Sequence, residues 1–459
     1  MRGLMLAGTN SNVGKTTVTM GIMAAFKKKG YRVMPSKTGP DYIDPMFHHF
    51  VTGEASTNLD TWMLDPEMIK TLFCRRLGPE DLAVVEGVMG LYDGASSGGE
   101  IGSSAYLSKV LGLPVFLIID GRGMSTSAAA LVKGYVDFDP DVHIAGVIVN
   151  RIATKSHYVL VKTAIEEHTG IPCVGWLPND AALTLESRHL GLIPADELAD
   201  LRGKVDRAAD LVLAHVDIDR MAARSGIKAL PGRPDPFEAY GDVYSDLTIA
   251  YAWDNAFNFY YRDNFSALKT LGVTLVPFSP LAAEDIPAEA DGLYLGGGFP
   301  EIFGKAFEAN RTFRARLRKR LESGLPCYAE CGGLMALTRS LVDKDGERYA
   351  GVGFLPADTV MTARLQRFGY VDVAAMLDGR RCHFKAHEFH HSLVEAKIPI
   401  PQIYQLSKRG KTWQCGYTRC NTLAGYPHVH FYADGADRFL FALLGRVRRA
   451  KAERTVGHA

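Results

Sequence analysis

The sequence has few cysteines, no long apolar run and almost no net charge. Its 7 cysteines, at positions 74, 173, 327, 331, 382, 415 and 420, are odd in number and lack paired C-x-x-C spacing. That pattern excludes a disulfide framework and a cysteine zinc site. No uncharged apolar run approaches the roughly 20 residues of a membrane span, and the first residues do not read as a signal peptide. We therefore expect a cytoplasmic protein that does not enter a membrane.

The charge balance excludes a further class of partner. Lys plus Arg number 52 and Asp plus Glu number 51, which leaves a net charge of +1. Such a chain has no field that recruits nucleic acid or an anionic membrane. At 459 residues it is too long for one hydrophobic core, so it predicts a globular protein of two or three domains that does not bind nucleic acid.

The order of apolar segments predicts two α/β domains. Short β-rich runs at 32–34, 82–85, 114–119 and 144–149 alternate with helical segments, which is typical of a parallel sheet covered by helices. A second series has its strands at 247–251, 273–276, 292–295 and 326–329, after the proline-rich stretch 230–236. We expect one domain over 1–235, a second over 246–445, and a frayed polar tail over 446–459.

A phosphate-binding loop follows the first apolar run. The segment from Gly8 to Thr17 reads GTNSNVGKTT and leads into a helical stretch. Strict P-loop spacing would put a glycine at Thr9, so Gly8 makes the loop a variant, and Asn10 replaces the lysine of partition ATPases. Backbone N–H groups, the lysine charge and a threonine hydroxyl suit a triphosphate with Mg²⁺. The residues predicted to bind the nucleotide and its substrate are Asn12, Gly14, Lys15, Thr16, Thr17 and Lys37.

Carboxylates follow the next strands at the edge where the triphosphate must lie. Asp41 and Asp44 follow the strand near Val33, and Glu86 ends the strand at 82–85. Because such a carboxylate completes Mg²⁺ coordination opposite a P-loop, we predict Thr16, Asp41 and Glu86 as the metal ligands. For Asp44, and equally for Asp93 beside Gly94, turn capping and a functional role remain open. Asn150 and Arg151 either contact the base or form a turn.

The second half contains a nucleophile elbow. Cys331 stands between a strand and a helix in YAECGGLM, with two glycines after it that permit a sharp turn. A thiol at a helix N-terminus is favoured as thiolate, and nearby N–H groups can form an oxyanion hole. We predict His430, roughly a hundred residues on, as its base. Cys327 is predicted to be a buried strand residue.

His387 to His391 match the zinc-protease pattern H-E-x-x-H. That pattern requires a helix, whereas the preceding residues 381–386 alternate like a strand and no third ligand is evident. We therefore interpret the histidines as a polar cluster that supports the cysteine domain.

These motifs together resemble the glutamine-dependent a,c-diamide synthases of tetrapyrrole and cobalamin biosynthesis. The resemblance covers nearly the whole chain and is carried by residues 8–17, 37–44, 86–94, 295–302, 330–335, 387–392 and 426–431. The first domain is similar to dethiobiotin synthetase and the second to class I glutamine amidotransferases. Many of the latter carry glutamate two residues after the histidine. This chain has Tyr432 there, so the resemblance implies a Cys331/His430 dyad.

The resemblance also implies a reaction. Glutamine supplies ammonia at Cys331, and ATP with Mg²⁺ activates the a and c side-chain carboxylates of cobyrinic acid as acyl phosphates. It places Asp41, Tyr42 and Ile43 in the synthetase site, with Asp41 and Glu86 serving the ATP and Mg²⁺ chemistry. Tyr42 and Ile43 are implied to influence which carboxylate reacts. A homodimer is implied as well.

Other interpretations stay open from the sequence. Hydrogenobyrinate or nickel sirohydrochlorin would undergo the same chemistry, and cobyric acid synthase is a relative that amidates other carboxylates of the ring. A different class is a partition-type regulatory ATPase with a silent second domain. Asn10 argues against that class, and it leaves Cys331 and His430 without a purpose.

Overall fold

The computed structural model describes the chain except for residues 96–98, 184, 186, 189–190, 193–197, 199, 229, 231 and 458–459. The chain divides into two compact units, Met1–Arg233 and Pro234–Ala459. The division falls within the proline-rich stretch 230–236. Within the described part of the chain, no helix has both the length and the hydropathy of a bilayer crossing.

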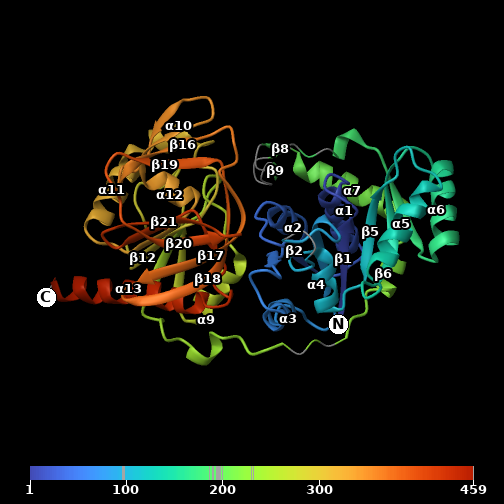
Figure 1. Cartoon of the computed structure of the whole chain (residues 1–459), viewed down its shortest axis with the longest axis horizontal. Helices are drawn as coiled ribbons and strands as arrows, with labels where there is room; N and C mark the ends of the chain where they lie inside the picture. Colours follow the sequence, from blue (N-terminus) through green and yellow to red (C-terminus); the bar gives the residue numbers. More distant parts are fainter. Residues whose placement is uncertain are drawn as a thin grey trace. The chain divides into compact units, whose positions relative to one another are not determined.

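The first unit is built on a seven-stranded sheet of order β3-β2-β4-β1-β5-β6-β7, in which all paired strands are parallel. The chain leaves β1 toward both edges, so right-handed crossovers place helices on both faces of the sheet (Figure 1). The strands are β1 (Arg2–Gly8), β2 (Val33–Thr38), β3 (Thr57–Leu59), β4 (Leu82–Gly90), β5 (Val115–Asp120), β6 (Ile144–Ile152) and β7 (Cys173–Pro178).

Helices α1 to α6 connect these strands, and α7 and α8 follow β7. They are α1 (Lys15–Lys28), α2 (Asp44–Thr52), α3 (Pro66–Cys74), α4 (Ser104–Leu111), α5 (Ser127–Phe138), α6 (Lys155–Thr169), α7 (Leu201–His215) and α8 (Ile218–Ala223). A small antiparallel pair, β8 (Ser187–Arg188) and β9 (Gly191–Leu192), lies outside the main sheet. The core strands are buried on both sides, as their continuous apolar runs predict.

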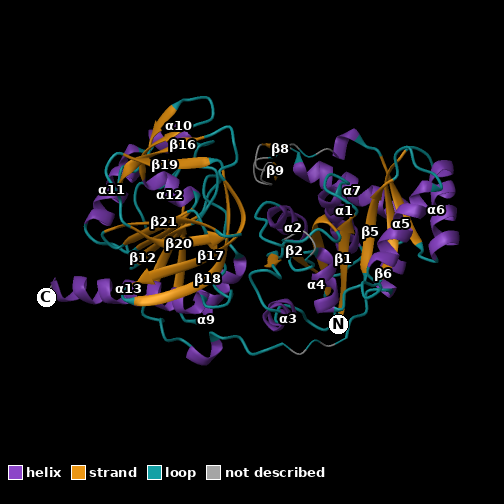
Figure 2. Ribbon diagram, viewed as in Figure 1, coloured by secondary structure: helices purple, strands orange, loops and turns teal. Residues whose placement is uncertain are grey.

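The second unit holds a ten-stranded sheet of order β11-β10-β12-β13-β22-β21-β20-β17-β18-β23. Its parallel half comprises β10 (Thr248–Ala252), β11 (Thr274–Phe278), β12 (Gly292–Leu295), β13 (Cys327–Glu330) and β22 (Thr422–Gly425). An antiparallel half follows, with β17 (Arg367–Leu377), β18 (Arg380–His390), β20 (Gln402–Lys408), β21 (Lys411–Arg419) and β23 (His428–Val429). Figure 2 shows the long strands of this half.

A four-stranded sheet of order β15-β14-β16-β19 accompanies the large one. Its strands are β14 (Thr338–Val342), β15 (Arg348–Ala350), β16 (Leu355–Met361) and β19 (Ser392–Ala396), and the helices of the unit are α9 (Arg262–Thr270), α10 (Gly304–Ala309), α11 (Arg311–Glu322), α12 (Gly332–Leu337) and α13 (Ala436–Gly457). All eight predicted strand segments lie in the two large sheets. The antiparallel half and the small sheet were not predicted, apart from the alternation at 381–386.

The prediction of a frayed tail is wrong over residues 446–457. Helix α13 continues to Gly457, and Val447 and Ala450 are buried on it. Lys451 pairs with Asp291 at 2.9 Å, so the basic residues that made the segment look solvated hold it to the sheet domain.

Candidate active sites

The P-loop connects β1 to α1 and has the backbone that phosphate binding requires. Asn12 and Gly14 have positive φ of 66° and 93°, and Gly14 caps α1 in the left-handed conformation. The Lys15 ammonium, exposed enough to meet a ligand, donates to the Asn10 carbonyl at 3.1 Å. Burial lowers the Lys15 pKa, and the Lys37 charge lowers it further. An anionic ligand would raise the Lys15 pKa again, because its negative charge offsets the positive charges of Lys15 and Lys37.

Asn150 at the end of β6 braces this loop. Its side-chain amide donates to the Val13 carbonyl at 2.8 Å, and a Cβ on Gly14 would lie only 2.5 Å from that amide nitrogen. Arg151 in turn pairs with Asp120 of β5 at 2.8 Å. The sequence left open whether Asn150 contacts the base or forms a turn. Its bond to Val13 indicates a third role, which is to fix the shape of the P-loop.

A buried cluster of charges lies beside the loop. Lys37 of β2 reaches Asp44 at 2.5 Å and Glu86 of β4 at 3.2 Å, and these side chains are at most 10% exposed. Burial alone would lower the Lys37 pKa, but the two carboxylates outweigh it and raise the pKa. Burial likewise acts to raise the Glu86 pKa, but Lys37 and His48 lower it, so Glu86 is held ionised.

Asp41 and Asp44 make different contacts, since Asp41 caps a turn and Asp44 lies beside Thr16. Oδ1 of Asp41 accepts the backbone N–H groups of Ile43 at 2.8 Å and Asp44 at 3.1 Å, so it caps the turn that enters α2. Oδ1 of Asp44 lies 3.2 Å from the Thr16 hydroxyl. Asp93 is a turn cap, since it accepts the Gly90 N–H at 2.8 Å. The carboxylate that joins Thr16 and Glu86 is therefore that of Asp44.

His48 is a member of this cluster that sequence reasoning missed. It is fully buried on α2, and its Nε2 lies 2.7 Å from Oε2 of Glu86 while its Nδ1 lies 3.0 Å from the Ser56 hydroxyl. The side chain occupies the turn of α2 after Asp44, a spacing that places both toward the sheet. A buried histidine so held fixes the orientation of the Glu86 carboxylate.

The oxygens of this cluster fit Mg²⁺. The Thr16 hydroxyl lies 3.0 Å from Oε1 of Glu86 and 3.2 Å from Oδ1 of Asp44, which brings one hydroxyl and two carboxylate oxygens together beside the P-loop. Mg²⁺ usually takes one or two carboxylates and completes its shell with water and phosphate oxygens. Among the described residues, no group of three or more His, Cys, Asp or Glu side chains forms a metal cage.

Cys331 forms the predicted elbow between β13 and α12. Its backbone has φ 45° and ψ −99°, a conformation that side chains rarely adopt, and its N–H donates to the Gly425 carbonyl at 2.8 Å. A Cβ on Gly332 would lie 2.9 Å from the Gly298 nitrogen, so the loop after β12 packs directly against the elbow. Only a glycine at position 332 leaves room for the loop to approach the elbow this closely.

The thiol is not the low-pKa thiolate that its helix position predicts. Cys331 is only 7% exposed, and burial raises its pKa, with a smaller contribution from Glu301. Burial thus outweighs the short helix, and the resting thiol is neutral. The sulfur therefore needs a base to remove its proton when it attacks.

The predicted base, His430, points to α9. Its Nε2 lies 3.7 Å from Asp263, its Nδ1 accepts the Tyr432 N–H at 3.3 Å, and its ring packs on Tyr261 at 4.9 Å. It is fully buried. Nδ1 is thus hydrogen-bonded, and Nε2 lies near the Asp263 carboxylate on α9 without a hydrogen bond to it.

His428, two residues earlier, packs instead against the glycine loop after β12. A Cβ on Gly297 would lie 2.4 Å from Cε1 and 3.2 Å from Nε2 of His428, so the imidazole packs on the glycine loop that contacts Gly332. Burial lowers the His428 pKa to about 3, helped by His387 and His390, so the ring is neutral at rest. The sequence contained a signal for it, since both histidines stand in the same short segment 426–431.

The H-E-x-x-H residues lie on a strand, as their alternation predicts. β18 spans the first four and ends at His390, and at about 3.3 Å per residue in an extended chain the first and last histidines are roughly 13 Å apart. His390 stacks on Tyr426 with ring centroids 3.6 Å apart, and Tyr426 lies 2.9 Å from the Ser392 hydroxyl. The cluster thus supports the chain that leads to His428.

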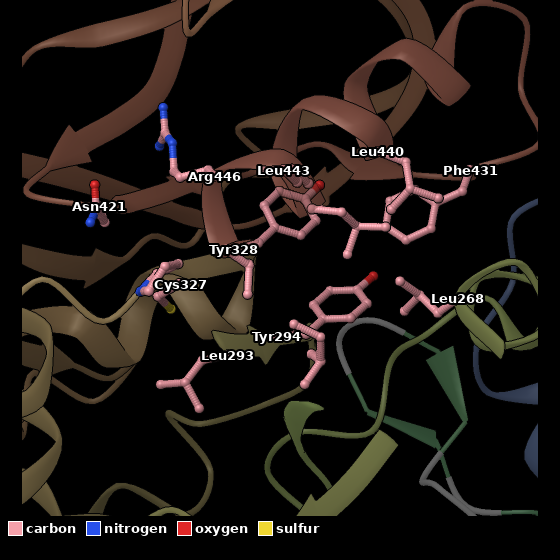
Figure 3. Close-up of a pocket in the computed structure, with 14 residues that line it drawn as sticks. Leu268, Leu293, Tyr294, Cys327, Tyr328, Asn421, Phe431, Leu440, Leu443 and Arg446 are labelled. Atoms are coloured by element: carbon pink, nitrogen blue, oxygen red, sulfur yellow. The ribbon is translucent and has the colours of Figure 1, made fainter. Parts of the chain in front are cut away.

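Cys327 is a buried strand residue, as predicted. It is 4% exposed and lines a largely apolar pocket with Leu268, Leu293 and Phe431, shown in Figure 3. Burial raises its pKa, so this thiol is inert. Tyr294 and Tyr328 line the same pocket, and both donate to the carboxylate of Glu330, the residue before the nucleophile.

The fold and the two sites define a class of protein, and comparison with known families agrees. Residues 4–193 match the CobQ/CobB/MinD/ParA nucleotide binding domain, and residues 248–436 match the CobB/CobQ-like glutamine amidotransferase domain. The chain is a glutamine amidotransferase that carries its own nucleotide-binding domain.

Curated relatives narrow the class. A protein of Listeria monocytogenes is 43% identical over 94% of this chain and 97% of its own length. A Streptococcus sanguinis protein is 44% identical over 95% and 97%, and a Salmonella typhimurium protein 41% over 93% and 94%. All three are named cobyrinate a,c-diamide synthase, and this chain belongs to that family.

Proposed function

We propose that the chain amidates the a and c side-chain carboxylates of cobyrinic acid, with ATP as the activating substrate and glutamine as the nitrogen source. The observation that carries the proposal is the presence in one chain of a P-loop with a buried lysine and carboxylate cluster and of a cysteine elbow. The relatives' shared name supplies the substrate.

In the amidotransferase unit, Cys331 attacks the side-chain amide carbon of glutamine. The thiol proton passes to a histidine, the S–C bond forms, and the carbonyl electron pair moves to an oxygen that backbone N–H groups near Gly297 and Gly332 stabilise. The C–N bond then breaks, the histidine returns its proton to the nitrogen, and ammonia leaves. Water hydrolyses the thioester to glutamate and restores the thiol.

We assign the base to His428, with His430 as the alternative that the sequence favours. The contact of His428 with Gly297 supports this choice, because Gly297 precedes the glycine that packs on the elbow. Burial lowers the His428 pKa to about 3, so the imidazole is neutral before the reaction. His430 instead orders the segment against α9 through Asp263.

In the synthetase unit, a carboxylate oxygen of the substrate attacks the γ-phosphorus of ATP, and the bond to ADP breaks. Ammonia then attacks the acyl carbon, phosphate leaves and a proton is lost, which leaves the amide. P-loop N–H groups and Lys15 hold the phosphates, with Asn12, Gly14 and Thr17 shaping the loop. We assign to Lys37 a contact with the substrate carboxylate, and to Tyr42 and Ile43 an influence on which carboxylate reacts.

Thr16, Asp44 and Glu86 would hold Mg²⁺, with Asp41 fixing the loop that carries Asp44. When bound, the ion supplies charge neutralisation at the phosphate oxygens. His48 keeps Glu86 oriented toward Thr16 from the other side of the carboxylate.

We also assign the protein to the cytoplasm and expect a homodimer. All 7 cysteines are free thiols, which fits a reducing compartment that supplies ATP. Sedimentation velocity of the purified chain tests the dimer.

The test is mass spectrometry of the product after incubation with cobyrinic acid, ATP, Mg²⁺ and glutamine. We expect the mass of two added amides. Four amides would indicate the cobyric acid synthase reaction. Unchanged cobyrinic acid, with glutamine and ATP both hydrolysed, would overturn the substrate, and hydrogenobyrinate and nickel sirohydrochlorin are then the next to incubate. Hydrolysis of ATP without any glutaminase activity would indicate the partition-type ATPase.

A further inference from the structure

Glu330, directly before the nucleophile, is the most elaborately held carboxylate of the second unit. It is 1% exposed at the end of β13. Oε1 accepts the Tyr328 hydroxyl at 2.7 Å and the Val429 N–H at 3.0 Å, and Oε2 accepts the Tyr294 hydroxyl at 3.0 Å. Hydrogen bonds from three strands, β12, β13 and β23, thus converge on one side chain that the reaction above does not use.

The fourth neighbour of this carboxylate is His428. Oε2 of Glu330 lies 3.7 Å from Nδ1 of His428, on the ring edge opposite the Nε2 that lies near Gly297. The Val429 N–H bond to Oε1 anchors the next residue of the same strand. The backbone and the ring of β23 are therefore both held by Glu330.

The position that carries an acid in many class I amidotransferases is occupied differently here. With His428 as the base, the position two residues later is His430, whose Nε2 lies 3.7 Å from Asp263. With His430 as the base it would be Tyr432, whose hydroxyl donates to Asp235 at 2.8 Å. That side chain is therefore directed to the segment that enters the second unit. Glu330 approaches the imidazole of His428 from within the sheet instead.

We propose that Glu330 is the positioning residue of the glutaminase site, holding His428 in the tautomer and orientation that accept the Cys331 proton. The proposal rests on the assignment of His428 as the base. Burial raises the Glu330 pKa to about 7, so the carboxylate is ionised above that pH, where it attracts the Nδ1–H of His428 and leaves the Nε2 lone pair for the thiol proton. The carboxylate also offsets the positive charge that the ring gains, without itself taking the proton.

Glu330 and Cys331 are neighbours in the sequence, so the same strand end positions both side chains. The turn at Cys331 sends the nucleophile one way, while Glu330 points back among Tyr294 and Tyr328. One strand end therefore sets both the sulfur and, through the acid, the base. Apo distances near 3.7 Å at such sites tighten when substrate closes the geometry.

The experiment measures steady-state glutamine hydrolysis by Glu330→Gln, which keeps size and oxygen but removes the charge. We expect kcat to fall about tenfold or more while KM stays within about twofold, since the variant binds glutamine but presents the wrong tautomer. The rate of iodoacetamide modification of Cys331, mapped by peptide mass spectrometry, should fall in parallel. Unchanged kcat in the folded variant overturns the proposal.

His428→Ala and His430→Ala separate this proposal from the assignment beneath it. Loss of kcat in His428→Ala, together with activity in His430→Ala, supports the base. The opposite pattern overturns the base and with it the role of Glu330. In the His428→Ala background, Glu330→Gln should lower the Cys331 modification rate no further. An undiminished effect there means that Glu330 acts through packing alone, which also overturns the proposal.

Two further variants serve as a control and as a substitute for Glu330→Gln. Asp291→Asn removes another buried carboxylate charge of the same unit, at the start of β12 away from the elbow, and should leave kcat and KM unchanged. If Glu330→Gln does not fold, Tyr294→Phe removes a donor to the same Oε2. We then expect a several-fold loss of kcat at constant KM, and an unchanged kcat would count against Glu330.

Discussion

At the scale of single residues, the charge balance of the first site depends on Lys37. Its ammonium is the one described cation within 4.0 Å of both Asp44 and Glu86, which are themselves buried. Removing one partner of a buried pair costs roughly 3–5 kcal/mol because the remaining charge is left uncompensated. In Lys37→Met we expect a loss of that size in the free energy of unfolding at pH 8.

The same variant should become more stable as the pH falls. Without Lys37, burial raises the folded-state pKa of the two carboxyls above the unfolded value. A raised carboxyl pKa gives stability that is present at low pH and lost as the pH rises through it. Urea titrations at pH 5 and pH 8 measure the difference. Lys28→Met, which breaks an exposed pair with Asp210, is the control, and an equal loss at both pH values would contradict the expectation.

The chemistry of the sites was predictable at this scale, but the partners were not. Gly14, Lys15, Thr16 and Cys331 are fixed by local spacing, which a sequence displays. Asp41 and Asp44 lie three residues apart, and the sequence does not show which of the two carboxylates turns back to cap α2. Likewise, the sequence does not show which of His428 and His430 has its ring against Gly297, because that contact joins segments more than a hundred residues apart.

At the scale of elements, α13 decides how far the second unit extends. Side chains of Val447 line the apolar pocket with Leu444, and a Cβ on Gly292 of β12 would lie 2.9 Å from Val447. Arg446 and Arg449 pair with Asp378, and Lys451 pairs with Asp291. The basic half of the helix therefore packs on both halves of the large sheet.

A chain that ends at Gly445 should lose this packing. Burying one valine contributes about 1.5–3 kcal/mol, so we expect the free energy of unfolding of the second unit to fall by roughly 2–4 kcal/mol. Thermal melts followed by near-UV circular dichroism measure it. A chain that ends at Thr455 keeps the buried contacts and should melt like the full chain. If both truncations melt alike, the helix end contributes no stability.

Parallel and antiparallel strands differed in how well the sequence predicted them. Buried parallel strands such as β5 are continuous apolar runs, which stand out from their surroundings. Strands such as β17 and β20 alternate buried and exposed residues and carry charges, so their segments resemble loops. Residues 446–457 were predicted to be a frayed tail for a similar reason, because composition does not show that their arginines form ion pairs.

At the scale of the whole molecule, each unit has its own sheet, its own core and its own reactive centre. The two half-reactions share only ammonia. Cys331→Ser should therefore abolish amidation with glutamine and retain it, within about twofold of the wild-type rate, when ammonium chloride is supplied at alkaline pH. The product mass and the rate of ADP formation measure this. Loss of ammonia-dependent amidation in the folded variant would mean that the elbow serves the synthetase reaction as well.

The buried, neutral thiol of Cys331 also bears on the chemical endurance of the enzyme. Peroxides attack thiolates, and they attack those that solvent can reach. A nucleophile that stays protonated and 7% exposed until glutamine arrives is shielded from that damage. Cys420, which is exposed, carries the surface risk instead. Burial thus protects the Cys331 sulfur from oxidation more than it protects the exposed sulfur of Cys420.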